Sequence, residues 1–306
     1  MIAVISVKEG VVMPKSMKID YYRVLIGEED QQNFDSIIEK ISNFPNDESR
    51  NYFHNNIPIR LQEMEKREHL WIGDMVKIRL NDIPPKTKMS GRQIDIDLDE
   101  DEGLGEETAF LYDQDVRVLV LQRNYTAVTA AGFTSYFKYF GNVKKLNLLP
   151  VVKPEAYQRM EKMNIVRRFE IDFAGLQNLS IAKGSGKGAN AMVDLANETD
   201  SPYQKVILSM GNQKGTIARI RSFVEEVLSL FKENVKKIKI TGKEFIDGET
   251  EIIDLLEDRM VDIEELDLPR GDHDLARKIR KQALYRAWNN RIPELEMMFL
   301  DPEVEQ

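Results

Sequence analysis

The chain of 306 residues is longer than a single hydrophobic core usually supports, so two domains are expected. Its hydrophobic content of 42% is ample for buried cores, and the absence of cysteine excludes disulfides, thiolate zinc sites and cysteine nucleophiles. A net charge of −9 argues against a protein that coats nucleic acid over its whole surface. No apolar run approaches the roughly 20 residues needed to span a bilayer, so we expect a soluble, cytoplasmic protein without membrane insertion.

The charge is unevenly distributed along the chain. Residues 1–150 carry −5 and residues 251–306 carry −7, whereas residues 151–250 carry +3. The acidic balance therefore leaves room for one local basic face in the middle of the second half.

The first half is predicted to be mostly β-strand. Short alternating or β-branched runs indicate strands at residues 19–26, 57–61, 70–80, 109–112 and 116–122. Helical spacing of apolar residues indicates helices at 31–43 and 131–140. We predict an antiparallel sheet or barrel with two covering helices.

The second half is predicted to alternate between strands and helices. Strands are expected at residues 146–152, 166–173, 205–210, 235–241 and 261–268, and helices at 155–163, 189–197, 216–233, 252–260 and 274–289. The fold class is therefore α+β, with a β-rich antiparallel N-terminal domain at residues 1–143. An α/β sandwich-like C-terminal domain follows at residues 144–306.

A dense run of acidic residues occupies positions 95–107, beginning with Asp95 and ending with Glu107. Its first part alternates acidic and aliphatic residues, as in a strand with one wet face, and its second part contains glycines suited to a turn. Such a run can hold a divalent cation or receive a basic partner, but it is more often a solvated edge.

A glycine-rich segment at residues 183–188 resembles a phosphate-binding loop only superficially. A Walker loop needs a glycine where this chain has Ile181, and Ser or Thr where it has Gly188. The segment is better explained as a cationic loop before a helix, or as a loop that touches nucleic-acid phosphate.

Basic residues of the second half form a candidate nucleic-acid-binding face. In the strand 235–241, Lys237 and Lys239 project opposite Ile238 and Ile240. The candidate binding residues are Lys183, Lys187, Lys214, Arg219, Arg221, Lys237 and Lys239. A solvated face with local ion pairs, or a surface for an acidic partner, remains an alternative explanation.

Neither a metal site nor a cofactor site is predicted. Asp272 or Asp274 beside His273 is explained by capping of the last helix. A metal-dependent nuclease needs an acid followed by Glu-x-Lys on the next strand, and this pattern is missing after Asp113 and Asp115. Glu170-Ile171-Asp172 also ends in Asp rather than Lys. Convergence of these four acids on one pocket would favour a hydrolase.

Three segments carry a resemblance to other proteins. They are Leu70-Trp71-Ile72-Gly73-Asp74, residues 99–108 (DEDEGLGEET) and residues 253–260 (IDLLEDRM). In these segments the chain resembles uncharacterised bacterial proteins from phage-defence and mobile-element gene clusters. The resemblance implies a role in antiviral defence but carries no functional residue.

The sequence thus predicts a non-catalytic factor that binds nucleic acid, or a nucleic-acid complex, through a basic face of the C-terminal domain. A divergent metal-dependent nuclease or hydrolase is one alternative, and a structural subunit of a protein assembly is another. The expected partners are nucleic acid and either a protein partner or further copies of the chain.

Overall fold

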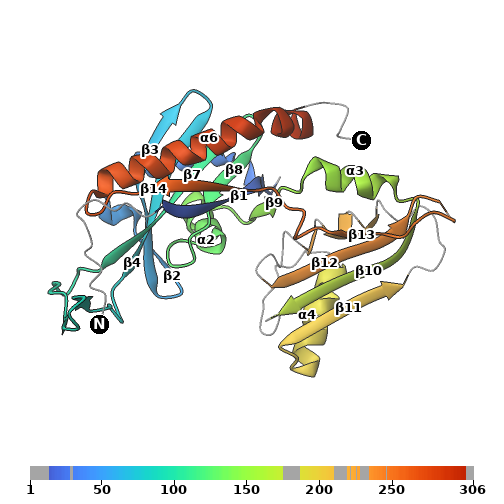
Figure 1. The fold of residues 1–306 in the computed structure, drawn as a ribbon, viewed down its shortest axis with the longest axis horizontal. Helices are drawn as coiled ribbons and strands as arrows, with labels where there is room; N and C mark the ends of the chain where they lie inside the picture. The colour runs from blue at the N-terminus through green and yellow to red at the C-terminus, as the bar shows by residue number, and fades with distance from the viewer. Residues whose placement is uncertain are drawn as a thin grey trace, which may run out of the picture. The chain divides into compact units, whose positions relative to one another are not determined.

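The computed structural model describes residues 14–27, 30–174, 187–209, 219–220, 222–224, 226–227, 234–245 and 247–300. The fold is α+β, as predicted, and the chain divides into two compact units (Figure 1). The first unit comprises residues 1–21, 26–146 and 261–306, and the second comprises residues 22–25 and 147–260.

The first unit is built on an antiparallel sheet. Its strands are β1 (Pro14–Ile26), β2 (Tyr52–His54), β3 (Ile57–Arg67), β4 (Leu70–Arg79), β7 (Leu104–Asp113), β8 (Val118–Gln122) and β14 (Val261–Asp267). They are ordered β14-β1-β8-β7-β4-β3-β2. Two short strands, β5 (Lys86–Thr87) and β6 (Gln93–Ile94), pair only with each other, and a 3-10 turn occupies Glu48–Arg50.

Helices cover both faces of this sheet. Helices α1 (Phe34–Ser42) and α2 (Ala130–Gly141) lie on one face, where Phe110 of β7 packs against Phe133 of α2. Helix α6 (His273–Phe299) lies on the other face, where Asp74 of β4 meets Lys281 (Figure 1). Successive residues of a strand point to opposite faces, so β4 and β7 each place side chains against the helices on both sides of the sheet.

The last segment of the chain differs from the predicted domain 144–306, because residues 261–306 return to the first unit. β14 pairs antiparallel with β1, from Pro14 opposite Asp267 to Asp20 opposite Val261. α6 then packs across β7 and β8. The pairing joins strands more than 230 residues apart, so local sequence patterns cannot reveal it.

The second unit is a two-layer sandwich. Its strands β10 (Ile165–Ala174), β11 (Tyr203–Ser209), β12 (Val235–Lys243) and β13 (Glu251–Asp254) form an antiparallel sheet ordered β11-β10-β12-β13. β9 (Leu146–Pro150) pairs with β1. Helices α3 (Pro154–Lys162) and α4 (Lys187–Thr199) contribute Met160 and Met192 to one core with Phe169, Phe173 and Ile238 of the sheet.

Two predictions about local structure have opposite outcomes. Residues 252–260 are not a helix: β13 is followed by a turn in which Asp254 accepts a hydrogen bond from the Leu256 amide. The β-branched Ile252 and Ile253 suit a strand beside β12 better than a helix. The N-cap prediction is confirmed, since the Asp272 side chain accepts from the Leu275 amide at 2.9 Å.

Within the described part of the chain, every helix is too short or too polar to cross a bilayer.

Candidate nucleic-acid interface

In the part of the second unit that the structure describes, helices cover one face of the sheet and leave the other open. Phe169, Ile171 and Phe173 of β10 enter the helix-covered core, so the intervening Arg168, Glu170 and Asp172 point away from it. The antiparallel register places the open-face residues of the other strands beside them. These neighbours are Tyr203, Lys205 and Ile207 on β11, Lys237 and Lys239 on β12, and Asp254 on β13. We call the residues of these two sets the open sheet face.

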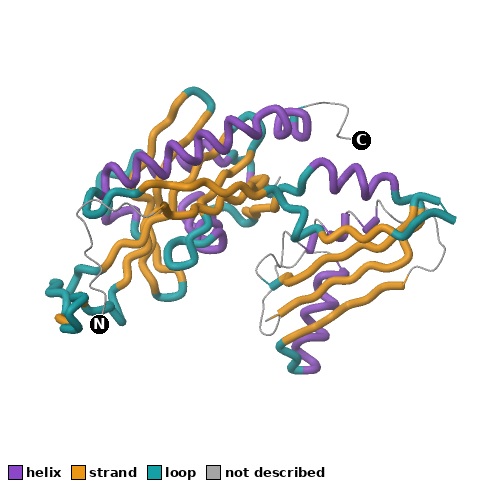
Figure 2. Tube along the Cα trace, in the orientation of Figure 1, coloured by secondary structure: helices purple, strands orange, loops and turns teal. Residues whose placement is uncertain are grey.

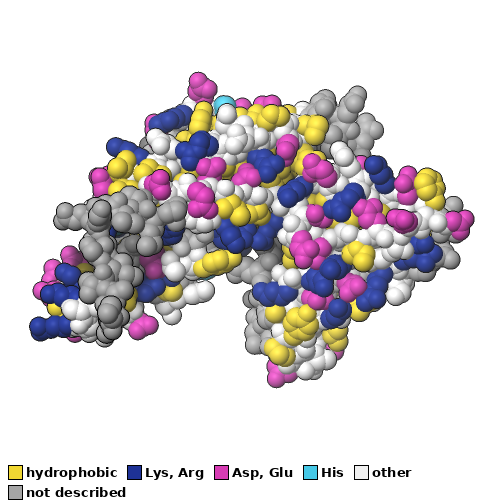
Figure 3. Space-filling view, viewed as in Figure 1, with side chains coloured by type: hydrophobic (Ala, Val, Ile, Leu, Met, Phe, Trp, Pro, Cys, Tyr) yellow, Lys and Arg dark blue, Asp and Glu magenta, His cyan; other side chains and the backbone are white. Residues whose placement is uncertain are grey.

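Most cations of the open sheet face already contact carboxylates. Arg168 Nε lies 2.8 Å from Glu170, and Lys205 Nζ lies 3.1 Å from the other oxygen of the same carboxylate. Lys239 Nζ lies 3.7 Å from Asp254. Figure 3 shows basic and acidic side chains intermingled on this unit. The alternative that the sequence allowed, a solvated face with local ion pairs, is therefore present here.

Lys237 is the exception on this face. Among the described residues it makes no ion pair, although it lies opposite Asp172 in the ladder. The hydrogen bond from Lys205, helped by the charges of Arg168 and Lys237, holds the pKa of Glu170 below its usual range. The face thus carries four cations against three carboxylates, and Lys237 supplies the excess.

Apolar and aromatic side chains are exposed beside these charges. Tyr203 is 52% exposed and Ile207 is 43% exposed, both on β11. The exposed ring of Tyr203 provides a surface on which a base can stack, and Ile207 adds apolar contact area beside it. Tyr203 and Lys205 were missed by the sequence analysis, although the alternation of residues 203–209 puts them on one side of a strand.

The predicted binding residues do not all lie together. Lys237 and Lys239 share the open sheet face, as the alternation predicted. Arg219 lies next to Ile220, which enters the helix-covered core, and Lys187 begins α4 in the same layer. Lys183, Lys214 and Arg221, and most of the glycine-rich segment, lie outside the described residues.

A family model matches residues 12–291, which is most of the chain, and its description is a family of unknown function, DUF6731. The chain belongs to the DUF6731 family. No curated protein matches it. The family description assigns no chemistry, so the function of this DUF6731 member is argued from its own side chains.

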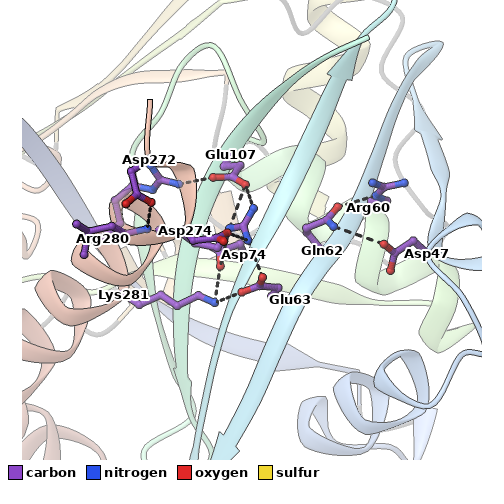
Figure 4. A network of polar contacts seen from close by, with 12 residues as sticks. Asp47, Arg60, Gln62, Glu63, Asp74, Glu107, Asp272, Asp274, Arg280 and Lys281 are labelled. Carbon is purple, nitrogen blue, oxygen red and sulfur yellow. Dashed lines mark hydrogen bonds and ion pairs between the residues drawn. The ribbon is translucent and has the colours of Figure 1, made fainter. Parts of the chain in front are cut away.

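A second charged cluster lies in the first unit, between α6 and the sheet. It joins three carboxylates to three cations: Glu63, Asp74 and Glu107 with Arg277, Arg280 and Lys281. Figure 4 shows the carboxylates on neighbouring strands, facing the cations of the helix. Lys281 Nζ lies 2.6 Å from Asp74 and 3.0 Å from Glu63. We call this set the α6 network.

Asp74 is the most unusual member of the α6 network. It is completely buried, and its Oδ1 has no hydrogen-bond partner among the described residues. Burial raises the pKa of Asp74 to about 6, although the charge of Lys281 opposes the shift. In Glu63, by contrast, the ion pairs with Lys281 and Arg277 outweigh burial and lower the pKa. The network fastens α6 to the sheet and offers no unpaired cation for a ligand.

A third cluster brings His69 close to Asp113 and Asp115, with potential ligand atoms within 4.8 Å of one another. The carboxylate of Asp113 already has structural partners. It accepts hydrogen bonds from the Asp115 and Val116 amides and from the Trp288 indole at 3.1 Å. These contacts explain Asp113 as the cap of the β7–β8 turn. Glu170 and Asp172 belong to the other unit, where Lys205 contacts both.

Proposed function

We propose that this protein binds single-stranded nucleic acid through the open sheet face of its second unit. The observation that carries the proposal is an antiparallel sheet whose described helices all lie on one side. Its other side presents Arg168, Lys205, Lys237 and Lys239 next to the exposed ring of Tyr203. Cations that follow a phosphate backbone, combined with aromatic stacking platforms, are the elements of single-strand recognition.

The ion pairs on this face do not prevent such binding. Arg168 and Lys205 have side chains that are 46% and 41% exposed. Ion pairs at this exposure contribute only about 0–1 kcal/mol, because water and salt screen them. A phosphate can therefore contact these cations from the solvent side while the carboxylate of Glu170, which is 14% exposed, keeps its own contacts. Lys237 makes no ion pair with the described residues and has none to lose.

A titration of the purified protein against labelled single-stranded DNA and RNA tests the proposal. Charge-assisted contacts contribute about 1.5–3 kcal/mol each, so Lys237→Glu combined with Lys239→Glu should weaken binding by at least about 100-fold. Binding of the wild-type chain should also fall steeply with salt.

A matched control is available within the same unit. Lys162→Glu combined with Arg219→Glu makes the same change in charge, but on exposed residues of the helical layer. This variant should retain wild-type affinity within about threefold. Equal losses in both variants, or no binding by the wild-type chain, would contradict the open sheet face as the interface.

A further inference from the structure

The connection between β4 and β7 is much longer than its geometry requires. The two strands pair directly, and Arg79 lies opposite Leu104 at the end of the ladder. Such a hairpin is closed by about 2–5 residues, yet here the chain runs through residues 80–103 before returning. Connections beyond about 12–15 residues are uncommon in compact domains, and they usually serve a function or act as linkers.

This connection contributes nothing to a core. Residues 84–97 are all exposed, and Met89 at the tip of the small β5–β6 hairpin is 94% exposed. Figure 2 shows the connection extending beyond the ends of β4 and β7. Because these residues are exposed, packing within the first unit does not explain the segment. The β5–β6 hairpin does not explain it either, since an isolated two-stranded hairpin is marginally stable at best.

The connection is divided sharply by charge. Residues 83–94, the cationic arm, contain Lys86, Lys88 and Arg92 and no acidic residue. Residues 95–103, the acidic stretch, contain six acidic residues and no basic one. The acidic run recognised in the sequence is thus one half of a larger bipolar segment.

The two halves do not neutralise each other. Within the described part of the chain, no ion pair joins the cationic arm to the acidic stretch. Each half closes on itself instead: the Gly91 amide donates to Lys88 O, and the Asp99 amide donates to the Glu102 carboxylate. Two complementary charged surfaces therefore stand side by side, and neither is paired with another described residue.

We propose that the connection is a self-association device, in which the cationic arm of one copy contacts the acidic stretch of a second copy. A two-fold axis makes this contact reciprocal, because each copy offers one surface of each sign. The 24 residues from 80 to 103 match the roughly 20–30 residues that each partner contributes to a standard interface. Nucleic acid fits the segment less well, since Asp82 and the acidic stretch give it a net charge of −4.

Charge exchange tests this proposal. The arm variant combines Lys86→Glu, Lys88→Glu and Arg92→Glu. The acid variant replaces Asp95, Asp97, Asp99, Glu100 and Asp101 by lysine and keeps Glu102, so that the stretch changes its net charge from −6 to +4. By sedimentation equilibrium without nucleic acid, the wild-type chain should be a dimer at low salt and dissociate as salt rises. Each variant alone should be monomeric, whereas an equimolar mixture should restore the dimer, because opposite charges then face each other on both sides.

Further measurements keep the outcome decisive. A single chain with all eight reversals should dimerise again, and the Lys162→Glu, Arg219→Glu variant should dimerise like the wild type. Circular dichroism checks that each variant is folded, which the full exposure of the segment predicts. A monomeric wild-type chain, or a mixture that stays monomeric, would overturn the proposal. Neither result depends on whether the open sheet face binds nucleic acid.

Discussion

The α6 network and the open sheet face have similar inventories of charge, but the cations of the α6 network are more deeply buried. In the α6 network three carboxylates meet three cations beneath a helix, and Asp74 is completely buried. On the open sheet face three carboxylates meet four cations, and Arg168 is 46% exposed. Burial, rather than the number of ion pairs, separates a structural cluster from a surface that can exchange partners.

The energetics follow from this difference. Removing one member of a buried pair leaves an uncompensated charge in a low dielectric and typically costs about 3–5 kcal/mol. Removing one member of an exposed pair changes stability by less than about 1 kcal/mol. Removing one cation from each cluster tests whether burial accounts for this difference in stability.

The largest effect is expected for Lys281→Met. The variant leaves Asp74 with the guanidinium of Arg277, at 3.9 Å, as its remaining ion-pair partner among the described residues. The free energy of unfolding should fall by about 3–5 kcal/mol at pH 8, as measured by urea denaturation. The loss should shrink at pH 5, where the Asp74 carboxyl is protonated. Lys278→Met, an exposed change on the same helix, should stay within about 0.5 kcal/mol of wild type.

An intermediate effect with a defined pH dependence is expected for Asp74→Asn. The pKa of Asp74 in the folded protein is about 6, above its ordinary value of 3.8. Protonation therefore favours the folded state, and the wild-type chain gains stability from this group as the pH falls from about 7 to 4. Asparagine gains none. The wild-type free energy of unfolding, relative to the variant, should rise by on the order of 2–3 kcal/mol over this range. A difference that is constant with pH would refute the buried, high-pKa carboxylate.

The smallest effect is expected for Arg168→Met on the open sheet face. Its partner Glu170 keeps the contact with Lys205 at 3.1 Å, and the arginine is solvated. The free energy of unfolding in urea should change by less than about 1 kcal/mol. A loss comparable to that of Lys281→Met would show that this face is structural.

Local sequence patterns predicted individual helices and strands and the side chains that share one face of each. The stripe of Phe34, Ile37, Ile38 and Ile41 predicted α1, and all four side chains are buried. Alternation in β12 placed Lys237 on one side of its strand. The dependence is physical, since the 3.6- and 2-residue periods decide which side chains share a face.

The α6 network could not be predicted in the same way. Its carboxylates come from β3, β4 and β7, and its cations come from a helix about 170 residues or more away along the chain. The available signals were Asp74 within the otherwise apolar start of a strand, and the spacing of Arg277 and Lys281 on one side of a helix. Neither signal indicates which carboxylate and which cation form an ion pair. The antiviral role implied by the resemblance stays a prediction.

The most direct test of nucleic-acid binding by the open sheet face is the salt dependence of affinity for a labelled single strand. Each phosphate contact contributes about 0.7 to the slope of log K against log salt for single strands. Lys237→Gln should therefore reduce the slope by about 0.7, while Arg219→Gln on the helical layer should leave it unchanged. Identical slopes for the wild type and Lys237→Gln would contradict the proposed interface.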